Sequence, residues 1–262
     1  ATTTYTVTGT DANGCVNTSV NTITVNALPT ISIAEADVSG VTPNDGNICN
    51  GGNATLTATG GSTYNWNSGE TTAAITKSPI ATTTYTVTGT NALTACANYT
   101  SYTIVVHALP IITVTEADNS GTTSNDGIIC SGAGATLTAL GASTYSWSPS
   151  AGLNASNIAS PEASPTVNTS YAATGTDING CVSTSGLISI VVKPLPTINT
   201  FESDASGLTA NDGIICKGGS ATLIAFGGVS YSWSPSINVS NAGIAEPVVT
   251  PTATTTYTVT GT

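Results

Sequence analysis

The feature that most constrains this sequence is that it repeats itself. A Leu-Pro pair begins at Leu28, Leu109 and Leu195, and these positions lie 81 and 86 residues apart. After each pair come a short apolar segment (TISIA, IITVT, TINTF) and an acidic loop that ends in cysteine (EADVSGVTPNDGNIC, EADNSGTTSNDGIIC, ESDASGLTANDGIIC). Self-similarity at a fixed period is typical of chains built from repeated structural units. We therefore expect tandem copies of one small domain.

Within a repeat, the pattern predicts short β-strands. In TTTYTVTGT, Tyr5 and Val7 fall on one face and the threonines on the other, as in a half-buried strand. Asn-Gly pairs at 13–14 and 179–180 are typical of tight hairpin turns. No segment keeps an apolar period of about 3.6 residues, so we expect almost no helix. Short alternating strands with frequent turn signals predict an all-β fold of immunoglobulin-like antiparallel β-sandwiches.

The repeat spacing also predicts the domain boundaries. Residues 1–27 would be the last strands of a preceding domain, and 28–108 and 109–194 complete domains. Residues 195–262 would form a domain that lacks its last strand. The linkers NALP, HALP and KPLP are short and contain proline, which favours a stiff, rod-like array.

The ten residues ATTTYTVTGT occur both at 1–10 and at 253–262. With the first copy placed on the second, Cys15 falls 51 residues after Cys216, the separation of Cys130 and Cys181. We therefore expect Cys15 and Cys216 to form inter-segment disulfides, each completing a domain with a neighbouring segment. The duplicated strand favours a longer continuous chain over a subunit contact.

Charge and hydropathy exclude several kinds of partner. The chain has three Lys, no Arg and 14 acidic residues, giving a net charge of −11. Nucleic acids and anionic membrane surfaces require clustered basic residues, so neither is an expected partner. The longest apolar run lies near 187–192, far below the roughly 20 residues of a membrane span, so no membrane insertion is expected.

One recurring string points to a family. The pattern W-S-P…P-T-x-T-T-x-Y-x-V-T-G-T-D-x-N-G-C resembles the immunoglobulin-like or PKD-like repeats of large surface adhesins. These adhesins occur in gliding bacteria that export proteins through the type IX pathway, and the resemblance covers essentially the whole chain. It implies an extracellular or cell-surface location and a role in adhesion, motility or matrix.

Six cysteines at regular intervals suggest disulfides and an oxidising compartment, with buried free thiols as the alternative. The expected intradomain bonds are Cys49–Cys96 and Cys130–Cys181, whose partners lie 47 and 51 residues apart. In each pair the first cysteine precedes the second strand and the second follows the hairpin before the last strand.

The acidic loops are the strongest candidates for a ligand site. Nine of the 14 carboxylates lie in their three copies: Glu35, Asp37, Asp45, Glu116, Asp118, Asp126, Glu202, Asp204 and Asp212. Clustered oxygen ligands suit a hard cation, so these residues are candidate Ca²⁺ ligands. The alternative is that Asp and Asn build turns with the adjacent glycines.

Aromatic residues and the single histidine give weaker indications of a ligand-binding or catalytic site. Trp66, Trp147 and Trp233 share one repeat position and are expected in the core, although an exposed tryptophan platform would bind glycans. Four tyrosines that share another repeat position are also expected to be structural: Tyr5, Tyr85, Tyr171 and Tyr257. His107 falls in a linker, away from any catalytic triad, so we expect no enzyme activity.

The expected function is therefore structural: the shaft of an extracellular bacterial filament or adhesin. Edge strands with few Lys favour association with neighbouring copies of the same array. The alternatives are a module that binds surface glycans and a non-catalytic appendage of a secreted hydrolase.

Overall fold

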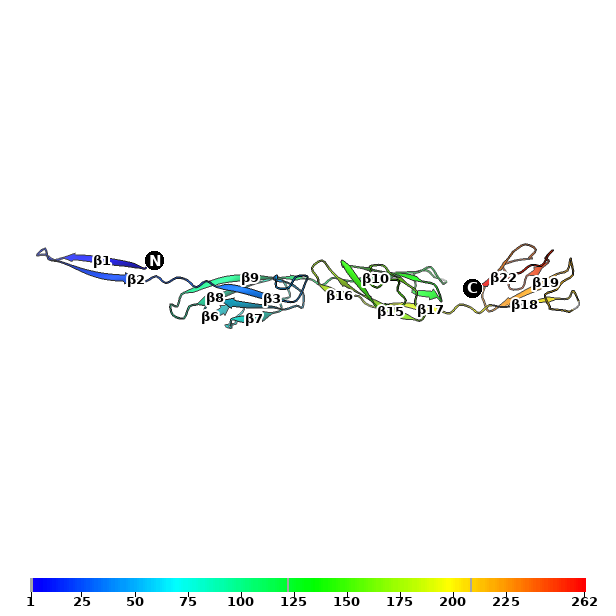
Figure 1. The fold of residues 1–262 in the computed structure, drawn as a ribbon, viewed down its shortest axis with the longest axis horizontal. Coiled ribbons are helices and arrows are strands. Elements are labelled where there is room, and N and C mark those ends of the chain that lie inside the picture. The colour runs from blue at the N-terminus through cyan, green and yellow to red at the C-terminus, as the bar shows by residue number, and fades with distance from the viewer. Residues whose placement is uncertain (1, 122, 208) are drawn as a thin grey trace. The chain divides into compact units, whose positions relative to one another are not determined.

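The computed structural model describes residues 2–121, 123–207 and 209–262. Its regular elements are β-strands throughout (Figure 1), which confirms the expected all-β class. Over these described ranges there is no helix, and so none that is long and apolar enough to cross a membrane.

The chain divides into two compact units. The first comprises Ala1–Glu116, Thr136–Ala163 and Ser170–Ile188, and the second comprises Ala117–Ala135, Ser164–Thr169 and Ser189–Thr262. The N-terminal hairpin and the whole first repeat thus lie in the first unit, and the whole third repeat lies in the second.

The N-terminal segment is a two-stranded hairpin. Strands β1 (Thr3–Thr10) and β2 (Val16–Ile23) pair antiparallel, from Thr3 opposite Ile23 to Thr10 opposite Val16. In the turn, Gly14 has a φ of 81°, which its missing Cβ permits. The Asp11 carboxylate accepts hydrogen bonds from the backbone amides of Asn13 and Cys15. Every described residue of the two strands is exposed, so both faces of the hairpin are open.

The first repeat consists of two sheets. One has the order β3 (Ser32–Asp37), β5 (Ala54–Thr59) and β7 (Ala74–Lys77). The other has the order β4 (Asn47–Cys49), β9 (Ala97–His107), β8 (Thr83–Thr90) and β6 (Thr63–Trp66). The pairs are antiparallel except β4 with β9, which run parallel. The short strand β4 therefore ends where β9 ends, at the linker to the next repeat.

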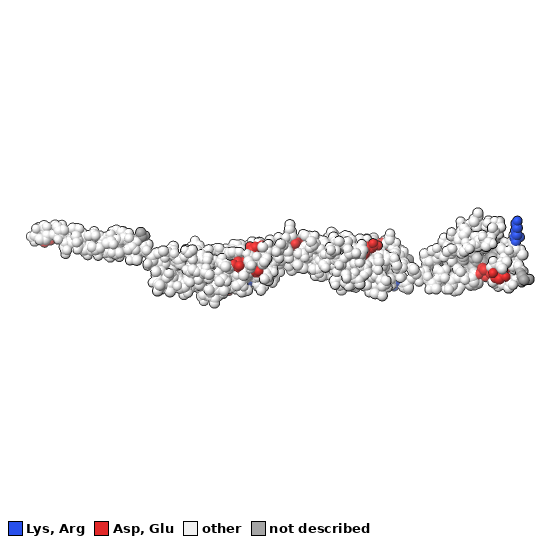
Figure 2. Space-filling view, viewed as in Figure 1, with Lys and Arg blue, Asp and Glu red and all other residues white. Residues whose placement is uncertain are grey.

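The core of the first repeat draws on both of its sheets. Five fully or almost fully buried side chains illustrate it: Ile48, Leu56, Trp66, Val87 and Ile104. On the opposite faces, threonine and serine hydroxyls pair across neighbouring strands, as between Thr84 and Thr103 at 2.8 Å. These hydroxyl pairs cover the sheet without charge, and Figure 2 shows how little of the visible surface carries Lys, Asp or Glu.

The second repeat follows the same strand plan. Its three-stranded sheet has the order β10 (Thr113–Ala117), β12 (Ala135–Leu140) and β14 (Glu162–Ala163). Its other sheet has the order β11 (Ile128–Cys130), β17 (Ile188–Lys193), β15 (Thr169–Thr176) and β13 (Thr144–Ser148), and β16 (Val182–Thr184) also pairs with β15. Again the short strand, β11, runs parallel to its neighbour.

The third repeat keeps only part of this plan. The sheet of β18 (Asn199–Asp204), β19 (Ala221–Phe226) and β21 (Val248–Val249) is present. Of the other sheet, β20 (Tyr231–Ser234) pairs with β22 (Thr258–Gly261). Residues 214–216, which correspond to β4, form no strand.

Candidate functional site: a disulfide-bonded junction

One disulfide joins two successive repeats. Cys49, at the end of β4 in the first repeat, is bonded to Cys181, in the hairpin between β15 and β16 of the second. The bond links positions 132 residues apart, with Cα atoms at 5.5 Å. Both cysteines belong to the first compact unit. The bond therefore connects the end of β4 in the first repeat to the β15–β16 hairpin of the second repeat.

The predicted intradomain pairs, Cys49–Cys96 and Cys130–Cys181, are wrong. Because β4 runs parallel to β9, Cys49 lies opposite His107 at the far end of that strand. Cys96 directly precedes Ala97 at the near end, so 11 strand residues separate the two cysteines, or roughly 35 Å. A disulfide requires Cα atoms within about 7 Å, so the two cannot meet inside one sandwich.

The acidic loop of the first repeat positions Cys49. The buried Asp37 carboxylate accepts hydrogen bonds from the backbone amides of Ser39 (2.8 Å) and Asn44 (3.0 Å). The Ser39 hydroxyl then accepts the backbone amide of Cys49 at 3.0 Å. Asn44 adopts a positive φ of 61°, a conformation that Asn tolerates better than most residues. The loop thus fixes the backbone that carries the sulfur.

The hairpin of the second repeat is shaped to meet this loop. Asp177 Oδ1 accepts the backbone amides of Asn179 and Cys181, both at 2.9 Å. Gly180 packs directly on the backbone of the first repeat, since a Cβ added to it would lie 2.6 Å from the carbonyl carbon of Gly40. Contact this close leaves no room for a side chain, so the Asn-Gly pair serves the junction as well as the turn.

The cysteine-positioning contacts recur in the other two acidic loops. The Ser120 hydroxyl accepts the amide of Cys130 at 3.2 Å, and the Ser206 hydroxyl accepts the amide of Cys216 at 3.4 Å. Over the described residues, the cysteines outside the one disulfide are unbonded: Cys15, Cys96, Cys130 and Cys216. The predicted inter-segment bonds of Cys15 and Cys216 stay predictions.

The nine candidate Ca²⁺ ligands do not all lie in loops. Five are at the ends of strands β3, β10 and β18, namely Glu35, Asp37, Glu116, Glu202 and Asp204, and four lie in the loops that follow, namely Asp45, Asp118, Asp126 and Asp212. Several of these carboxylates accept hydrogen bonds from backbone amides. Asp45, Asp126 and Asp212 each accept the amide two residues further on. Glu35 accepts the amide of Gly46, and Glu202 that of Gly213. Among the described residues, no group of three or more His, Cys, Asp or Glu side chains is arranged to hold a metal ion. This geometry favours the turn-forming role, and Ca²⁺ binding stays a prediction.

Three carboxylates lie close together in the acidic loop of the first repeat, and their proximity and burial shift the pKa values of neighbouring groups. Burial raises the pKa of Glu35, partly offset by the hydrogen bond from Gly46, and repulsion from Asp37 and Asp45 raises it further. Burial and the same three carboxylates also raise the pKa of Tyr102. Hydrogen bonds from backbone amides to these carboxylates therefore offset the repulsion among the three acidic side chains of the loop.

The aromatic candidates are mostly internal. All three tryptophans are buried, and each indole N–H donates to a backbone carbonyl, that of Thr72, Ile158 or Ile244. They provide no exposed platform for a glycan. Of the four equivalent tyrosines, Tyr85 and Tyr171 are buried, Tyr257 is half-buried and Tyr5 is exposed. His107 contacts the Asn47 side chain at 3.1 Å, across the β4–β9 pair.

No protein-family model and no curated protein sequence matches this chain.

Proposed function

We propose that this chain is a structural segment of an extracellular bacterial surface filament or adhesin, built from tandem immunoglobulin-like repeats. The observation that carries the proposal is the bond between Cys49 and Cys181, which crosses from one repeat to the next. An intradomain disulfide protects a single fold, whereas a bond across a junction transmits tension from one fold to its neighbour. Such a bond is useful to a chain that bears load.

Two further features support this role. Threonine and serine hydroxyls pair across exposed strand faces, as Thr84 does with Thr103, and Figure 2 shows charged side chains only in a few small groups on a mostly uncharged visible surface. The disulfide also fits an oxidising, extracellular location. The repeat string that resembles surface adhesins agrees with the same setting.

Force spectroscopy on single molecules of residues 1–262 tests the proposal. With the bond intact, the 132-residue loop closed by Cys49 and Cys181 cannot extend when the chain is pulled from its ends. Reduction should add about 450 Å of contour length, at roughly 3.3–3.6 Å per residue. The Cys181→Ser variant should release that length without reductant, and Cys96→Ser should behave as wild type. Equal extension of oxidised and reduced chains would count against a load-bearing junction.

A further inference from the structure

One sheet of the third repeat has an apolar outer face. Its strands β18, β19 and β21 are all present, in the order found for β3, β5 and β7 of the first repeat, so this sheet is complete. Side chains alternate across a sheet, and the inner face here includes Ala225, which is 4% exposed. The outer face carries Phe201 on β18 and Phe226 on β19, which are 55% and 49% exposed. Their ring centroids lie 6.0 Å apart, edge to face.

Aliphatic side chains lie beside the two rings. The segment that leads into β21 continues along β19, because Ala225 donates its amide to the carbonyl of Ala245. The strand register then places three further side chains on the outer face: Ile224, Ile244 and Val248. Together with the two rings they form the phenylalanine face. A contiguous exposed apolar patch of this kind is typical of an interaction site.

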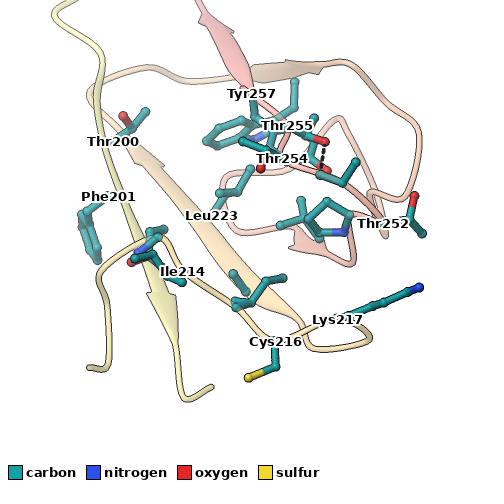
Figure 3. A pocket seen from close by; sticks show the side chains of 18 residues that line it. Thr200, Phe201, Ile214, Cys216, Lys217, Leu223, Thr252, Thr254, Thr255 and Tyr257 are labelled. Atoms are coloured by element: carbon teal, nitrogen blue, oxygen red, sulfur yellow. Dashed lines mark hydrogen bonds between the residues drawn. The ribbon is translucent and has the colours of Figure 1, made fainter. Parts of the chain in front are cut away.

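The phenylalanine face is separate from the groove of the third repeat. That groove has a volume of about 690 Å³ and is lined by core-facing residues such as Leu223 and Val249. Phe201 borders the groove at β18, but its ring points away from Leu223 and Tyr257 (Figure 3). A ligand on the phenylalanine face would therefore contact the opposite side of the sheet.

The first two repeats lack this face. At the positions of Phe201 and Phe226 the first repeat has Ala34 and Thr59, and both are exposed in that complete repeat. The Thr59 hydroxyl pairs across the strands with a serine hydroxyl at 2.7 Å. The second repeat has a threonine and Leu140 at the two positions. The strand plan thus forms twice without the rings, so the fold does not require them.

Polar groups on the same face include one carboxylate and no cation. The register of β19 with β21, continued from Val248, places Glu246 opposite Ile224. Asn199 lies opposite Phe226, and both polar side chains are exposed. Nine outward-facing positions make up the sheet face: Asn199, Phe201, Ser203, Thr222, Ile224, Phe226, Ile244, Glu246 and Val248. Aromatic rings beside a carboxylate and an amide suit a ligand that has both C–H faces and hydroxyl groups.

A neutral polysaccharide has this combination. Its C–H bonds stack on the electron-rich faces of aromatic rings, and its hydroxyls donate to a carboxylate without a countercharge. An anionic polysaccharide would be repelled by Glu246 and by the net charge of −11. A second copy docked through the same face would bury Glu246 against apolar side chains with no cation to pair with it, which is costly.

We propose that the phenylalanine face of the third repeat binds a neutral polysaccharide. Phe201 and Phe226 stack on sugar rings, and Glu246 and Asn199 form hydrogen bonds with sugar hydroxyls. The site adds binding to the structural role proposed above and does not involve the disulfide between repeats. Its test and the force experiment can therefore fail independently.

The test is affinity electrophoresis of residues 1–262 in native gels that contain hydroxyethylcellulose, xylan, mannan or dextran. We expect at least one of these neutral polysaccharides to retard the chain, and dextran sulfate not to retard it. Phe201→Leu combined with Phe226→Leu should raise the dissociation constant at least about tenfold, because leucine keeps the face apolar but removes the rings. Tyrosine at both positions keeps the rings and should retain binding.

Leu140→Ala is the matched control, since Leu140 is the exposed counterpart of Phe226 in the second repeat. It removes an apolar side chain from a face without aromatic rings and should leave retardation unchanged. Glu246→Ala should weaken binding, because it removes the acceptor for sugar hydroxyls. Tryptophan fluorescence in urea checks that each variant is folded.

Three results would overturn the proposal: no retardation by any of the neutral polysaccharides, equal retardation of wild type and the double leucine variant, or an equal loss from Leu140→Ala. Sedimentation supplies the remaining alternative. If the tyrosine and leucine variants self-associate as wild type does, and alanine at both positions abolishes self-association without affecting retardation, the face binds a second copy instead.

Discussion

The first and third repeats share a strand plan, yet one is closed and the other is open. In the first repeat, β9 fills the centre of the four-stranded sheet, and Ile48 beside it is 0% exposed. In the third, that place is a groove, and Ile215, the counterpart of Ile48, is half-buried. The first repeat is also bonded to its neighbour through Cys49, whereas the equivalent Cys216 is unbonded and exposed.

The difference shows which half of the fold stands alone. The sheet β18-β19-β21 forms without the missing strand, and Trp233 stays 4% exposed against it. Residues 214–216, by contrast, are not a strand, although the homologous residues form β4 in the first repeat. Three residues make too few ladder hydrogen bonds to persist alone, so β4 depends on β9. Four substitutions test this comparison, and they follow in order of expected effect.

The largest effect should come from Cys181→Ser, which removes the disulfide between the first and second repeats. The third repeat has no equivalent bond, since Cys216 is unbonded. A crosslink that closes a loop of 132 residues contributes about 5 kcal/mol in the chain-entropy picture. We expect the first two repeats to unfold at clearly lower urea concentration, measured by tryptophan fluorescence. Cys96→Ser is the control, since Cys96 is unbonded. Equal midpoints for the two variants would show that the bond adds no stability.

The next largest effect is expected from Ile104→Ala, which weakens the packing of β9, the strand without a counterpart in the described part of the third repeat. Ile104 is fully buried on β9, so its truncation should cost about 2–5 kcal/mol. Hydrogen exchange should show faster loss of protection at β4 and β8 than at β3 and β5. Ser101→Ala, at an exposed position of the same strand, should change little. Uniform loss of protection across both sheets would contradict the dependence of β4 on β9.

A smaller effect is expected from alanine substitutions at the hairpin glycines Gly180 and Gly14. Comparing the two variants distinguishes backbone strain in the turn from steric contact between repeats. Gly180 and Gly14 have φ values of 76° and 81°, so alanine is strained at both. Only Gly180 is crowded, by the backbone of Gly40 and Val41, whereas nothing lies within 4 Å of a Cβ on Gly14. We expect Gly180→Ala to cost about 1–3 kcal/mol, with the strain alone at the lower end. Thermal unfolding that ranks Gly14→Ala as the more harmful change would refute this contact.

The smallest effect concerns Glu35→Gln. Because burial raises the pKa of Glu35, the folded protein holds the proton more tightly than the unfolded chain does. The associated stability is present below the ordinary pKa of 4.5 and is lost as the pH rises through the raised value. The neutral variant should therefore be slightly more stable than wild type at pH 7, and equal to it in acid.

Glu70→Gln is the opposite-sign control for this experiment. Lys77 and Ser68 lower the pKa of Glu70 to about 2, so its contribution is lost only as the pH falls toward that value. Thermal unfolding between pH 3 and pH 7 distinguishes the two patterns. A parallel response of both variants would rule out the assigned cause.

Local patterns in the sequence predicted the fold well. Alternation in TTTYTVTGT gave the correct inward residues in the first repeat, where Tyr85 and Val87 are buried on β8, but not in the N-terminal hairpin, where Tyr5 and Val7 are 61% and 66% exposed. The Asn-Gly turns and the core tryptophans also follow from local chemistry, because positive φ favours glycine and a central-strand indole needs a core. These features depend on neighbours in sequence or on one face of one strand.

The disulfide partner could not be predicted in this way, because it depends on which end of a strand a cysteine occupies. The segment NIC is only three residues long, and its parallel pairing with β9 leaves no periodic signal. The close approach of Gly180 to Gly40 likewise cannot be predicted from the alternation of polar and apolar residues. One signal was present: the hairpin cysteine always precedes the last strand and the linker follows it, so the two cysteine types lie at opposite ends of a repeat.

The bond between Cys49 and Cys181 also changes the outcome of proteolysis of this chain. The linker that follows β9, at residues 108–110, lies inside the loop that the disulfide closes. A single cut there, or at any other exposed peptide bond between the two cysteines, leaves both fragments covalently attached. The junction therefore has two parallel covalent connections, and severing it requires both proteolysis and reduction.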